Sequence, residues 1–334
     1  MGLAANIVLG ERYRLIRRLG RGGQSEVWLG ERLATGQHVA IKAHIDKDVP
    51  DPVALQRFVR EARAISQLRH PNTVRLFDFG SGPAGYQFMI LEYIEGETLE
   101  SWLKKMAAQG HVPNQAQIID IGVQVLRALA EAHSLGIVHR DIKPANVMMQ
   151  QLAGEAPLVR LVDFGIAWVS QSVLTGLGRS MGTPAYMSPE QSMGRPVDGR
   201  TDLYSLGLVL YRCAAGRPPF DGKPMQVISQ QMTAEPLSLA ETTRTPLSQR
   251  LVAAVHRALA KNPEERFATA TEMRLALEAA SLQPLAPLQN ERHYLPVRSD
   301  GTSVPATSDA SCDLSTEVDL SSPKSRSRVG ASES

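Results

Sequence analysis

An eight-residue stretch near the middle of the chain places three chemically useful side chains on one short loop. Asp141, Lys143 and Asn146 follow one another at spacings of two and three residues in the sequence HRDIKPAN. A carboxylate can accept a proton from a hydroxyl group, a lysine can neutralise a migrating phosphoryl group, and an amide oxygen can ligate a metal ion. These residue types at this spacing predict phosphoryl transfer from ATP.

The pattern of apolar residues predicts a sheet-forming region before about residue 95. Five short stretches are rich in β-branched, aromatic or other apolar residues. One stretch between them has apolar residues at three- and four-residue spacing, which is typical of a helix. Five strands and one helix make a small antiparallel-sheet lobe. The predicted strands are 13–19, 26–33, 38–45, 73–79 and 86–94, and the predicted helix is 52–68.

The chain after about residue 98 is predicted to be mainly helical. Asn114 and Gln117 have the pattern of a capping box for a helix that runs to about Leu135 and stops at Gly136. Its apolar positions form one stripe, so we expect this helix to be central. The predicted fold class is therefore α+β, with a larger helical lobe after the sheet lobe. Further helices are predicted at 202–215, 225–232, 248–259 and 271–280, and short strands at 147–149 and 159–162.

The composition is that of an ordinary globular protein and limits the classes of partner. Apolar residues make up 43% of the chain and the formal net charge is +2. No basic stripe and no apolar window of 18 or more residues occurs, so we expect neither a nucleic-acid nor a membrane partner. Cys213 and Cys312 lie in different contexts, which favours a reducing cytoplasm. Serine, threonine and proline dominate residues 283–334, which predicts a disordered tail.

The loop and the motifs around it resemble the eukaryotic-type protein kinases over roughly residues 11–281. These motifs include a glycine-rich hairpin at 20–27, an apolar strand ending at Lys42, Asp163-Phe164-Gly165, and Ser188-Pro189-Glu190. The segments GGQSEV and GTPAYMSPEQ are similar to those of the bacterial Hanks-type group. The resemblance implies the bilobal protein-kinase fold. It divides the chain into an N-terminal extension (1–10), an N-lobe (11–94), a C-lobe (95–282) and the tail (283–334).

The resemblance implies a role for each residue that would act on the phosphates. Lys42 would hold the α- and β-phosphates and pair with Glu61, which lies on the polar side of the predicted helix. Asn146 and Asp163 would ligate Mg²⁺, or Mn²⁺ as a substitute. A few hard oxygen ligands suit Mg²⁺, which keeps several waters and takes its other ligands from phosphate.

The resemblance also implies the choice of phosphate acceptor. Asp141 would orient the substrate hydroxyl and accept its proton. Lys143 and Thr183 are typical of serine/threonine kinases rather than tyrosine kinases. His139 is expected to be structural and to stack on Phe164.

The nucleotide site implied by the resemblance lies between the glycine-rich hairpin and the end of the last predicted N-lobe strand. Ser25 occupies the third glycine position of the GxGxxGxV pattern, a departure that we expect to be tolerated. Leu91 would be the gatekeeper, and the backbones of Glu92 and Ile94 would bind adenine. The other expected contacts are Leu19, Gly20, Gly22 and Gly23 in the hairpin, and Val27, Ala40 and Met148 around the adenine ring.

The segment between Asp163 and Glu190 resembles a kinase activation segment. Arg140 would receive a phosphate on this segment, and the candidates are Ser170, Ser172, Thr175 and Ser180, of which Thr175 is favoured. Two further pairings are implied for the C-lobe: Glu190 with Arg266, and Asp202 with the backbone of the catalytic loop.

Three functions remain open at this point. The first is a cytoplasmic signalling enzyme that phosphorylates protein serine or threonine, autophosphorylates on its activation segment, and is opposed by a cognate phosphatase. The second is a pseudokinase, which the presence of the five residues Lys42, Glu61, Asp141, Asn146 and Asp163 argues against. The third is a small-molecule kinase, which the peptide-binding motifs argue against. The resemblance also allows a homodimer through the N-lobes, and no residue establishes it.

Overall fold

We describe a computed structural model of the chain over residues 3–21, 25–44, 52–81, 87–164 and 184–285. Nine of the residues singled out above lie outside the described residues, as does most of the predicted tail. They are Gly22, Gly23, Gly165, Ser170, Ser172, Thr175, Ser180, Thr183 and Cys312.

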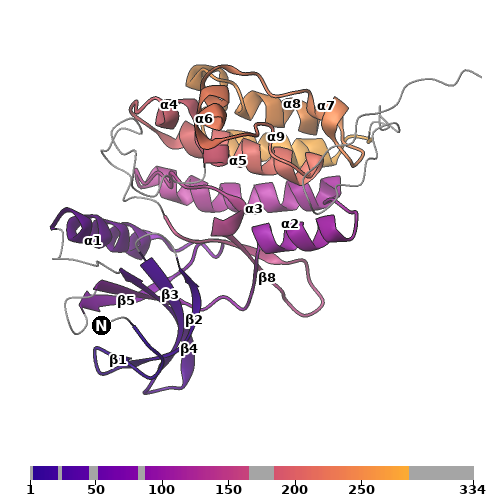
Figure 1. The fold of residues 1–334 in the computed structure, drawn as a ribbon. Helices are drawn as coiled ribbons and strands as arrows, with labels where there is room; N and C mark the ends of the chain where they lie inside the picture. Colours follow the sequence, from indigo (N-terminus) through magenta and orange to yellow (C-terminus); the bar gives the residue numbers. More distant parts are fainter. Residues whose placement is uncertain (1–2, 22–24, 45–51, 82–86, 165–183, 286–334) are drawn as a thin grey trace, which may run out of the picture. The chain divides into compact units, whose positions relative to one another are not determined.

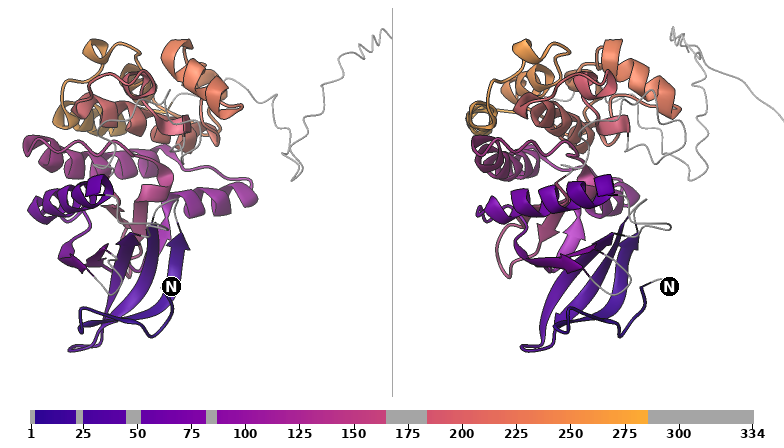
Figure 2. Two further views of the ribbon diagram at one scale, coloured as in Figure 1. Left: turned by 60° about the vertical axis from the view of Figure 1, so that its left-hand side comes forward. Right: turned by 90° about the vertical axis from the view of Figure 1, so that its left-hand side faces the viewer.

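The N-terminal region forms a six-stranded antiparallel sheet with one helix (Figure 1). Its strands are β1 (Val8–Leu9), β2 (Tyr13–Arg21), β3 (Ser25–Arg32), β4 (Gln37–His44), β5 (Leu76–Ser81) and β6 (Gln87–Glu92), paired in the order β1-β2-β3-β4-β6-β5. Helix α1 (Pro52–Gln67) contacts β5 and β6 and runs beside the strands in both views of Figure 2. The predicted antiparallel lobe with one helix is confirmed.

Two details of the predicted sheet differ from the structure. Strand β1 precedes residue 11, where the N-lobe was predicted to begin, because Leu9 pairs with Tyr13 and is buried. A strand of two residues is too short to show the alternation of apolar and polar residues by which strands are predicted. The predicted strand 73–79 begins only at Leu76, since Thr73 and the N–H of Val74 pair with Leu161 of the C-lobe instead.

The strand register determines which side chains face the helix. Lys42 stands opposite Val27 and Met89, and Ala40 stands opposite Leu91. Paired residues, and residues two apart on one strand, point to the same face of a sheet. Val27, Ala40, Lys42 and Leu91 therefore share one face. The opposite face contributes to a separate buried cluster that includes Leu15, Trp28, Ile41, Phe88 and Ile90.

The remainder of the described chain is mainly helical, as predicted, and the change falls between β6 and β7 (Gly96–Thr98). A three-stranded sheet pairs β7, β8 (Val147–Gln150) and β9 (Leu158–Leu161). The helices are α2 (Leu99–Ala108), α3 (Gln115–Ser134), α4 (Pro189–Ser192), α5 (Gly199–Ala215), α6 (Pro224–Thr233), α7 (Leu239–Thr242), α8 (Gln249–Ala258) and α9 (Ala270–Ser281). Single 3-10 turns are η2 (Pro144–Asn146), η4 (Pro184–Tyr186) and η5 (Pro263–Glu265).

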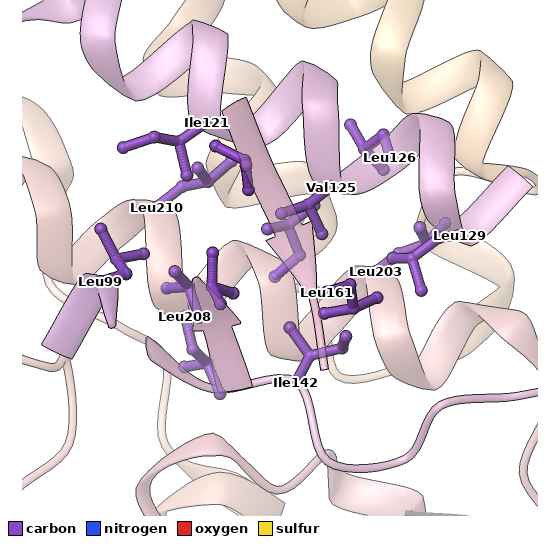
Figure 3. Packing of buried hydrophobic residues seen from close by; sticks show 14 of the residues in the cluster. Leu99, Ile121, Val125, Leu126, Leu129, Ile142, Leu161, Leu203, Leu208 and Leu210 are labelled. Atoms are coloured by element: carbon purple, nitrogen blue, oxygen red, sulfur yellow. The ribbon is translucent and has the colours of Figure 1, made fainter. Parts of the chain in front are cut away.

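Helix α3 lies at the centre of the C-lobe core and contacts α5, α9 and β9. Its predicted capping box is present: the side chain of Asn114 accepts from the N–H of Gln117, and the side chain of Gln117 accepts from the N–H of Asn114. Figure 3 shows its apolar stripe, including Val125 and Leu129, packed among side chains of α5 and β9. Each fully buried aliphatic side chain contributes about 1.5–3 kcal/mol. Ile142 of the loop after α3 and Leu161 at the end of β9 belong to this core, which holds the two segments together.

These elements constitute the bilobal α+β fold of the protein kinases. Within the described residues, no helix is both long enough and apolar enough to cross a lipid bilayer.

Candidate active site

A lysine from the sheet meets two carboxylates, one from each side of the site. Lys42 Nζ lies 2.7 Å from Glu61 Oε1 on α1 and 3.3 Å from Asp163 Oδ1 after β9. Lys42 reaches them because it lies on the sheet face that α1 covers, as the register requires. The predicted pairing of Lys42 with Glu61 is therefore present, and Asp163 joins it from the C-lobe.

Charge interactions in this group keep Lys42 protonated and Asp163 ionised. Burial alone would lower the pKa of Lys42, but the charges of Asp163 and Glu61 more than offset it, so the pKa is raised and the lysine stays protonated. The charge of Lys42 lowers the pKa of the Asp163 carboxyl against the opposite effect of burial. A cation and an ionised carboxylate are thus held side by side near neutral pH.

The catalytic loop brings Asp141, Lys143 and Asn146 into direct contact. Lys143 Nζ lies 2.7 Å from Asp141 Oδ2, and Asn146 Nδ2 donates to the same oxygen at 2.8 Å. The backbone turns tightly through η2, where the N–H of Asn146 bonds the carbonyl oxygen of Lys143. Asp141 Oδ1 accepts no hydrogen bond from the described residues, which leaves it as the atom able to receive a substrate proton.

A buried aspartate from α5 holds the backbone of this loop. Asp202, fully buried, accepts hydrogen bonds from the N–H groups of His139 (2.8 Å) and Arg140 (2.7 Å). Its carboxylate also contacts His133 Nε2 at 2.8 Å. Arg140 has a φ of 68°, in the left-handed region that costs a non-glycine residue of the order of 1–3 kcal/mol. The two bonds to Asp202 support this strained turn directly before Asp141.

Asn146 and Asp163 are candidates for holding a metal ion. They are brought together by a hydrogen bond from the N–H of Val162 to the carbonyl oxygen of Asn146 (3.0 Å). The amide nitrogen of Asn146 is occupied by Asp141, so its oxygen is available, and the Asp163 side chain is 39% exposed. An amide oxygen and a carboxylate are the hard donors that Mg²⁺ prefers. No cluster of three or more His, Cys, Asp or Glu suited to a metal occurs in the described part of the chain, so the other ligands would have to come from nucleotide and water.

The rings of His139 and Phe164 are in contact, as the sequence analysis expects, but they are tilted by 42° and not stacked in parallel. Their rings are 4.4 Å apart between centroids, and Phe164 is fully buried. His139 Nδ1 accepts from the N–H of Asp141, so Nε2 carries the hydrogen and donates to the carbonyl oxygen of Val162. Burial lowers the pKa of His139, which keeps it neutral. The ring links the catalytic loop to the strand end that carries Asp163.

Three of the side chains expected around adenine, Val27, Ala40 and Leu91, share the sheet face of Lys42, and the fourth, Met148, lies on β8 of the three-stranded sheet. Val27, Ala40 and Met148 are partly buried, and Leu91 is buried. Leu19, in contrast, is 39% exposed on β2, and Gly22 and Gly23 lie outside the described residues. The apolar part of the expected site is therefore formed by strands β3, β4, β6 and β8.

The end of β6 shows one feature that limits how it could contact adenine. The N–H of Glu92 donates to the carbonyl oxygen of Arg75 at 2.9 Å, so a contact with adenine would have to use the Glu92 carbonyl group. The Glu92 carboxylate is paired with the guanidinium of Arg160 on β9, which also donates to the carbonyl oxygen of Pro71. Arg160 thereby ties the end of β6 to the C-lobe.

The segment after residue 183 is anchored deep in the C-lobe. Arg266 is fully buried and makes two hydrogen bonds to Glu190, of 2.8 and 2.9 Å. Gln191, the next residue, donates to the carbonyl oxygen of Arg140 at 2.8 Å. The segment is thus fixed on one side to the core and on the other to the residue before Asp141.

The comparisons with known proteins agree with this geometry. The family model described as "Protein kinase domain" matches residues 13–276. The chain belongs to this family. Pkn1, a serine/threonine-protein kinase of Myxococcus xanthus, is 40% identical over 272 residues, which are 80% of this chain and 38% of the relative. PknB, a serine/threonine-protein kinase of Mycobacterium tuberculosis, is 39% identical over 276 residues, which are 80% of this chain and 43% of the relative.

Solved structures support the same assignment. The PknI kinase domain of Mycobacterium tuberculosis has a TM-score of 0.66 and 29% identity, covering 84% of this chain and 100% of that chain. The predicted resemblance to bacterial Hanks-type kinases is confirmed by these matches. This kinase domain spans about two fifths of the length of the curated relatives named above.

Sequence analysis missed three residues that hold the kinase site together: Gln191, Arg160 and Gln231. Each is a polar side chain that contacts backbone or charge far away in the sequence, at separations of 51, 68 and 46 residues. Spacing along the chain gives no signal for such contacts. Only the Glu190 motif, next to Gln191, marks one of these positions.

Proposed function

We propose that this kinase domain is an active, ATP-dependent serine/threonine protein kinase. The observation that carries the proposal is the convergence of Lys42, Glu61 and Asp163 from both lobes on a catalytic loop that presents Asp141 and Asn146. Related kinases with this family model are named serine/threonine-protein kinases. We assign the N-lobe to residues 11–94 with β1 added, and the C-lobe to 95–282.

The reaction divides among these residues as follows. The hydroxyl of a substrate serine or threonine gives its proton to Asp141 Oδ1 while its oxygen forms a bond to the γ-phosphorus of ATP, and the bond to the β-phosphate oxygen breaks to release ADP. Lys143, held 2.7 Å from Asp141, lies where its charge stabilises the migrating phosphoryl group. Lys42 contacts the α- and β-phosphates. Mg²⁺, or Mn²⁺ in its place, held by Asn146 and Asp163 would neutralise charge on the phosphates.

A regulatory role for Arg140 forms part of the proposal. Its Nε atom is buried and has no hydrogen-bond partner among the described residues, which is costly unless a further group binds there. A phosphate on Thr175 or Ser180, placed by autophosphorylation, would satisfy it with charge-assisted hydrogen bonds. Thr183 would contact Asp141 and Lys143 from the same segment. An opposing phosphatase, a homodimer and a cytoplasmic location stay predictions.

The test of the function is the identity of the phosphorylated residue. Purified protein is incubated with γ-labelled ATP, Mg²⁺ and a set of serine, threonine and tyrosine peptides, beside an Asp141→Asn variant. We expect phosphoserine and phosphothreonine with the wild type and a large loss with the variant. Label on tyrosine alone would contradict the assignment. So would the absence of label from folded wild type that binds ATP, which is the behaviour of a pseudokinase.

A further inference from the structure

A chain of buried hydrogen bonds runs behind η4, the turn that begins the described part of the chain after residue 183. Gln231 on α6 is fully buried, and its Nε2 donates to the carbonyl oxygens of Ala185 (3.1 Å) and Pro184 (3.4 Å). Its Oε1 accepts from the hydroxyl of Tyr204 on α5 at 2.7 Å. The hydroxyl in turn lies 3.0 Å from Lys261 Nζ.

The direction of every hydrogen bond in this chain is fixed by its first member. The ammonium group of Lys261 can only donate, so the hydroxyl of Tyr204 accepts from it and must direct its own hydrogen to Gln231 Oε1. This fixes the amide of Gln231 with its NH₂ group toward the two carbonyl oxygens. The two carbonyl oxygens can only accept and require the same orientation, so Lys261, Tyr204 and the backbone of η4 together specify one orientation of the buried amide.

The surroundings of Lys261 hold it in place. Its Nζ lies over the ring of Phe220 at 4.4 Å and over that of Tyr204 at 5.5 Å, and the Arg266 guanidinium lies over the Tyr204 ring at 4.7 Å. The pKa of Lys261 is lowered to about 8, chiefly by burial; the charge of Glu235 opposes the change and that of Arg266 adds to it. The aromatic rings and the hydroxyl compensate in part for the loss of water around the ammonium group.

The segment that continues from this turn reaches the catalytic loop at Gln191, which follows Tyr186 in the sequence. Gln191 donates to the carbonyl oxygen of Arg140, the residue before Asp141. Pro184 and Ala185 are only partly buried, so one side of the turn faces α6 and the other is accessible. Because the segment that contains the turn also bonds to the residue before Asp141, we expect a protein whose hydroxyl reaches Asp141 to come near this accessible side. The position of the two carbonyl groups therefore affects the surface that a protein substrate meets.

We propose that Gln231, oriented by Tyr204 and Lys261, is a positioning residue that shapes the peptide-binding surface at Pro184 and Ala185. This inference rests on the proposed function. It differs from a purely structural role because it affects the binding of protein substrate and leaves the binding of ATP unchanged, since no member of the chain contacts the nucleotide face of the sheet.

The test compares Gln231→Met with Gln230→Met, the same change at the neighbouring position of α6. Loss of the amide leaves the carbonyl oxygen of Ala185 without a donor among the described residues and removes one of the two donors to that of Pro184, which also accepts from the N–H of Met187 at 3.2 Å. We expect KM for a serine peptide to rise roughly 3- to 10-fold, which corresponds to about 0.7–1.4 kcal/mol. KM for ATP should change less than twofold, and Gln230→Met should resemble the wild type. Equal changes in both KM values, or no change in KM for peptide, would overturn the inference.

Tyr204→Phe provides a second variant that keeps the ring and removes only the hydroxyl, in case Gln231→Met does not fold. It should raise KM for peptide in the same direction by a smaller factor, because the amide remains but is no longer oriented. Unchanged KM for peptide in folded Tyr204→Phe would also overturn the inference. A wild type no more active than Asp141→Asn would overturn the proposed function and this inference together. An active wild type with unaffected variants would overturn the inference alone.

Discussion

Two ion pairs in this kinase domain have nearly the same length and opposite surroundings. Lys42 and Glu61 lie 2.7 Å apart in the site, while Arg266 and Glu190 lie 2.8 Å apart in the C-lobe. Arg266 donates in addition to three backbone carbonyl oxygens, and Glu190 accepts from Thr201, so the C-lobe pair is closed and saturated.

The pair of Lys42 and Glu61 in the site is open in comparison, which means that its hydrogen-bonding groups are not all occupied by the described residues of the protein. Lys42 is shared with Asp163, whose side chain is 39% exposed, and it can exchange part of this interaction for a bound phosphate. A saturated, buried pair contributes structure, because removing one partner leaves an uncompensated charge. An unsaturated pair with an accessible third charge can contribute chemistry. The difference shows that distance alone does not distinguish the two roles.

The largest expected effect is on the stability of the folded protein, when the saturated pair of Arg266 and Glu190 is broken. Arg266→Met leaves Glu190 buried without its partner and should lower the free energy of unfolding by about 3–5 kcal/mol. Arg127→Met is the control, because Arg127 is half exposed and lies 3.8 Å from Glu278, a pair worth at most about 1 kcal/mol. Chemical denaturation of both variants measures the difference. Equal losses of unfolding free energy in Arg266→Met and Arg127→Met would show that the saturated buried pair contributes no more than an exposed one.

The next effect falls on activity instead of stability. Lys42→Met should reduce phosphoryl transfer by about 10²–10³-fold, since a charge that stabilises the transition state is lost. Its free energy of unfolding should fall less than that of Arg266→Met. Burial already raises the pKa of Glu61, which can take up a proton when its partner is removed.

The matched control for this variant is Lys104→Met, at a lysine that is 71% exposed. It should keep the wild-type rate of transfer. Near-normal transfer by folded Lys42→Met would show that the open pair has no part in the chemistry.

The smallest effect concerns the pH dependence of stability near the closed pair. Lys261 faces Arg266, Glu235 and the Tyr204 ring, and its pKa is about 8 in the folded protein against 10.5 ordinarily. Between these two values the unfolded chain binds more protons at this site, so stability rises with pH. The free energy of unfolding of the wild type, relative to Lys261→Met, should therefore increase from pH 8 to 10.5. The slope should stay below about 1.4 kcal/mol per pH unit.

Denaturation of the two proteins in parallel isolates this contribution from the other groups that titrate at high pH. A difference that stays constant or decreases over the same interval would show that Lys261 is not desolvated.

The comparison also explains what could be predicted from the sequence. Lys42, Asp141, Asn146 and Asp163 were found because each occupies a fixed place in a local motif, at the end of a strand or within one tight loop. Glu61 required only the phase of one helix, which the apolar positions of α1 supply. Local order was therefore sufficient to place most helices and strands and to single out the residues that we propose act on the phosphates.

The supporting contacts could not be predicted in the same way. Glutamine has no pattern that marks a buried position, so the bonds of Gln191 to Arg140 and of Gln231 to η4 follow only from how the helices pack. The backbone of Arg140 and Asp163 is left-handed, with φ values of 68° and 54°. This region is uncommon for any residue other than glycine, although aspartate enters it more often than arginine, so the sequence does not mark either position. Strand β1 is too short to give a periodic signal.

The central claim is that Asp141 accepts the proton of a serine or threonine hydroxyl. The most direct measurement is the initial rate of phosphoryl transfer from ATP to a serine peptide by the wild type, Asp141→Asn and the control Asp221→Asn, an exposed aspartate on the loop before α6. We predict a rate about 10²–10⁴-fold lower for Asp141→Asn and an unchanged rate for Asp221→Asn. A folded Asp141→Asn variant with the wild-type rate would contradict the account.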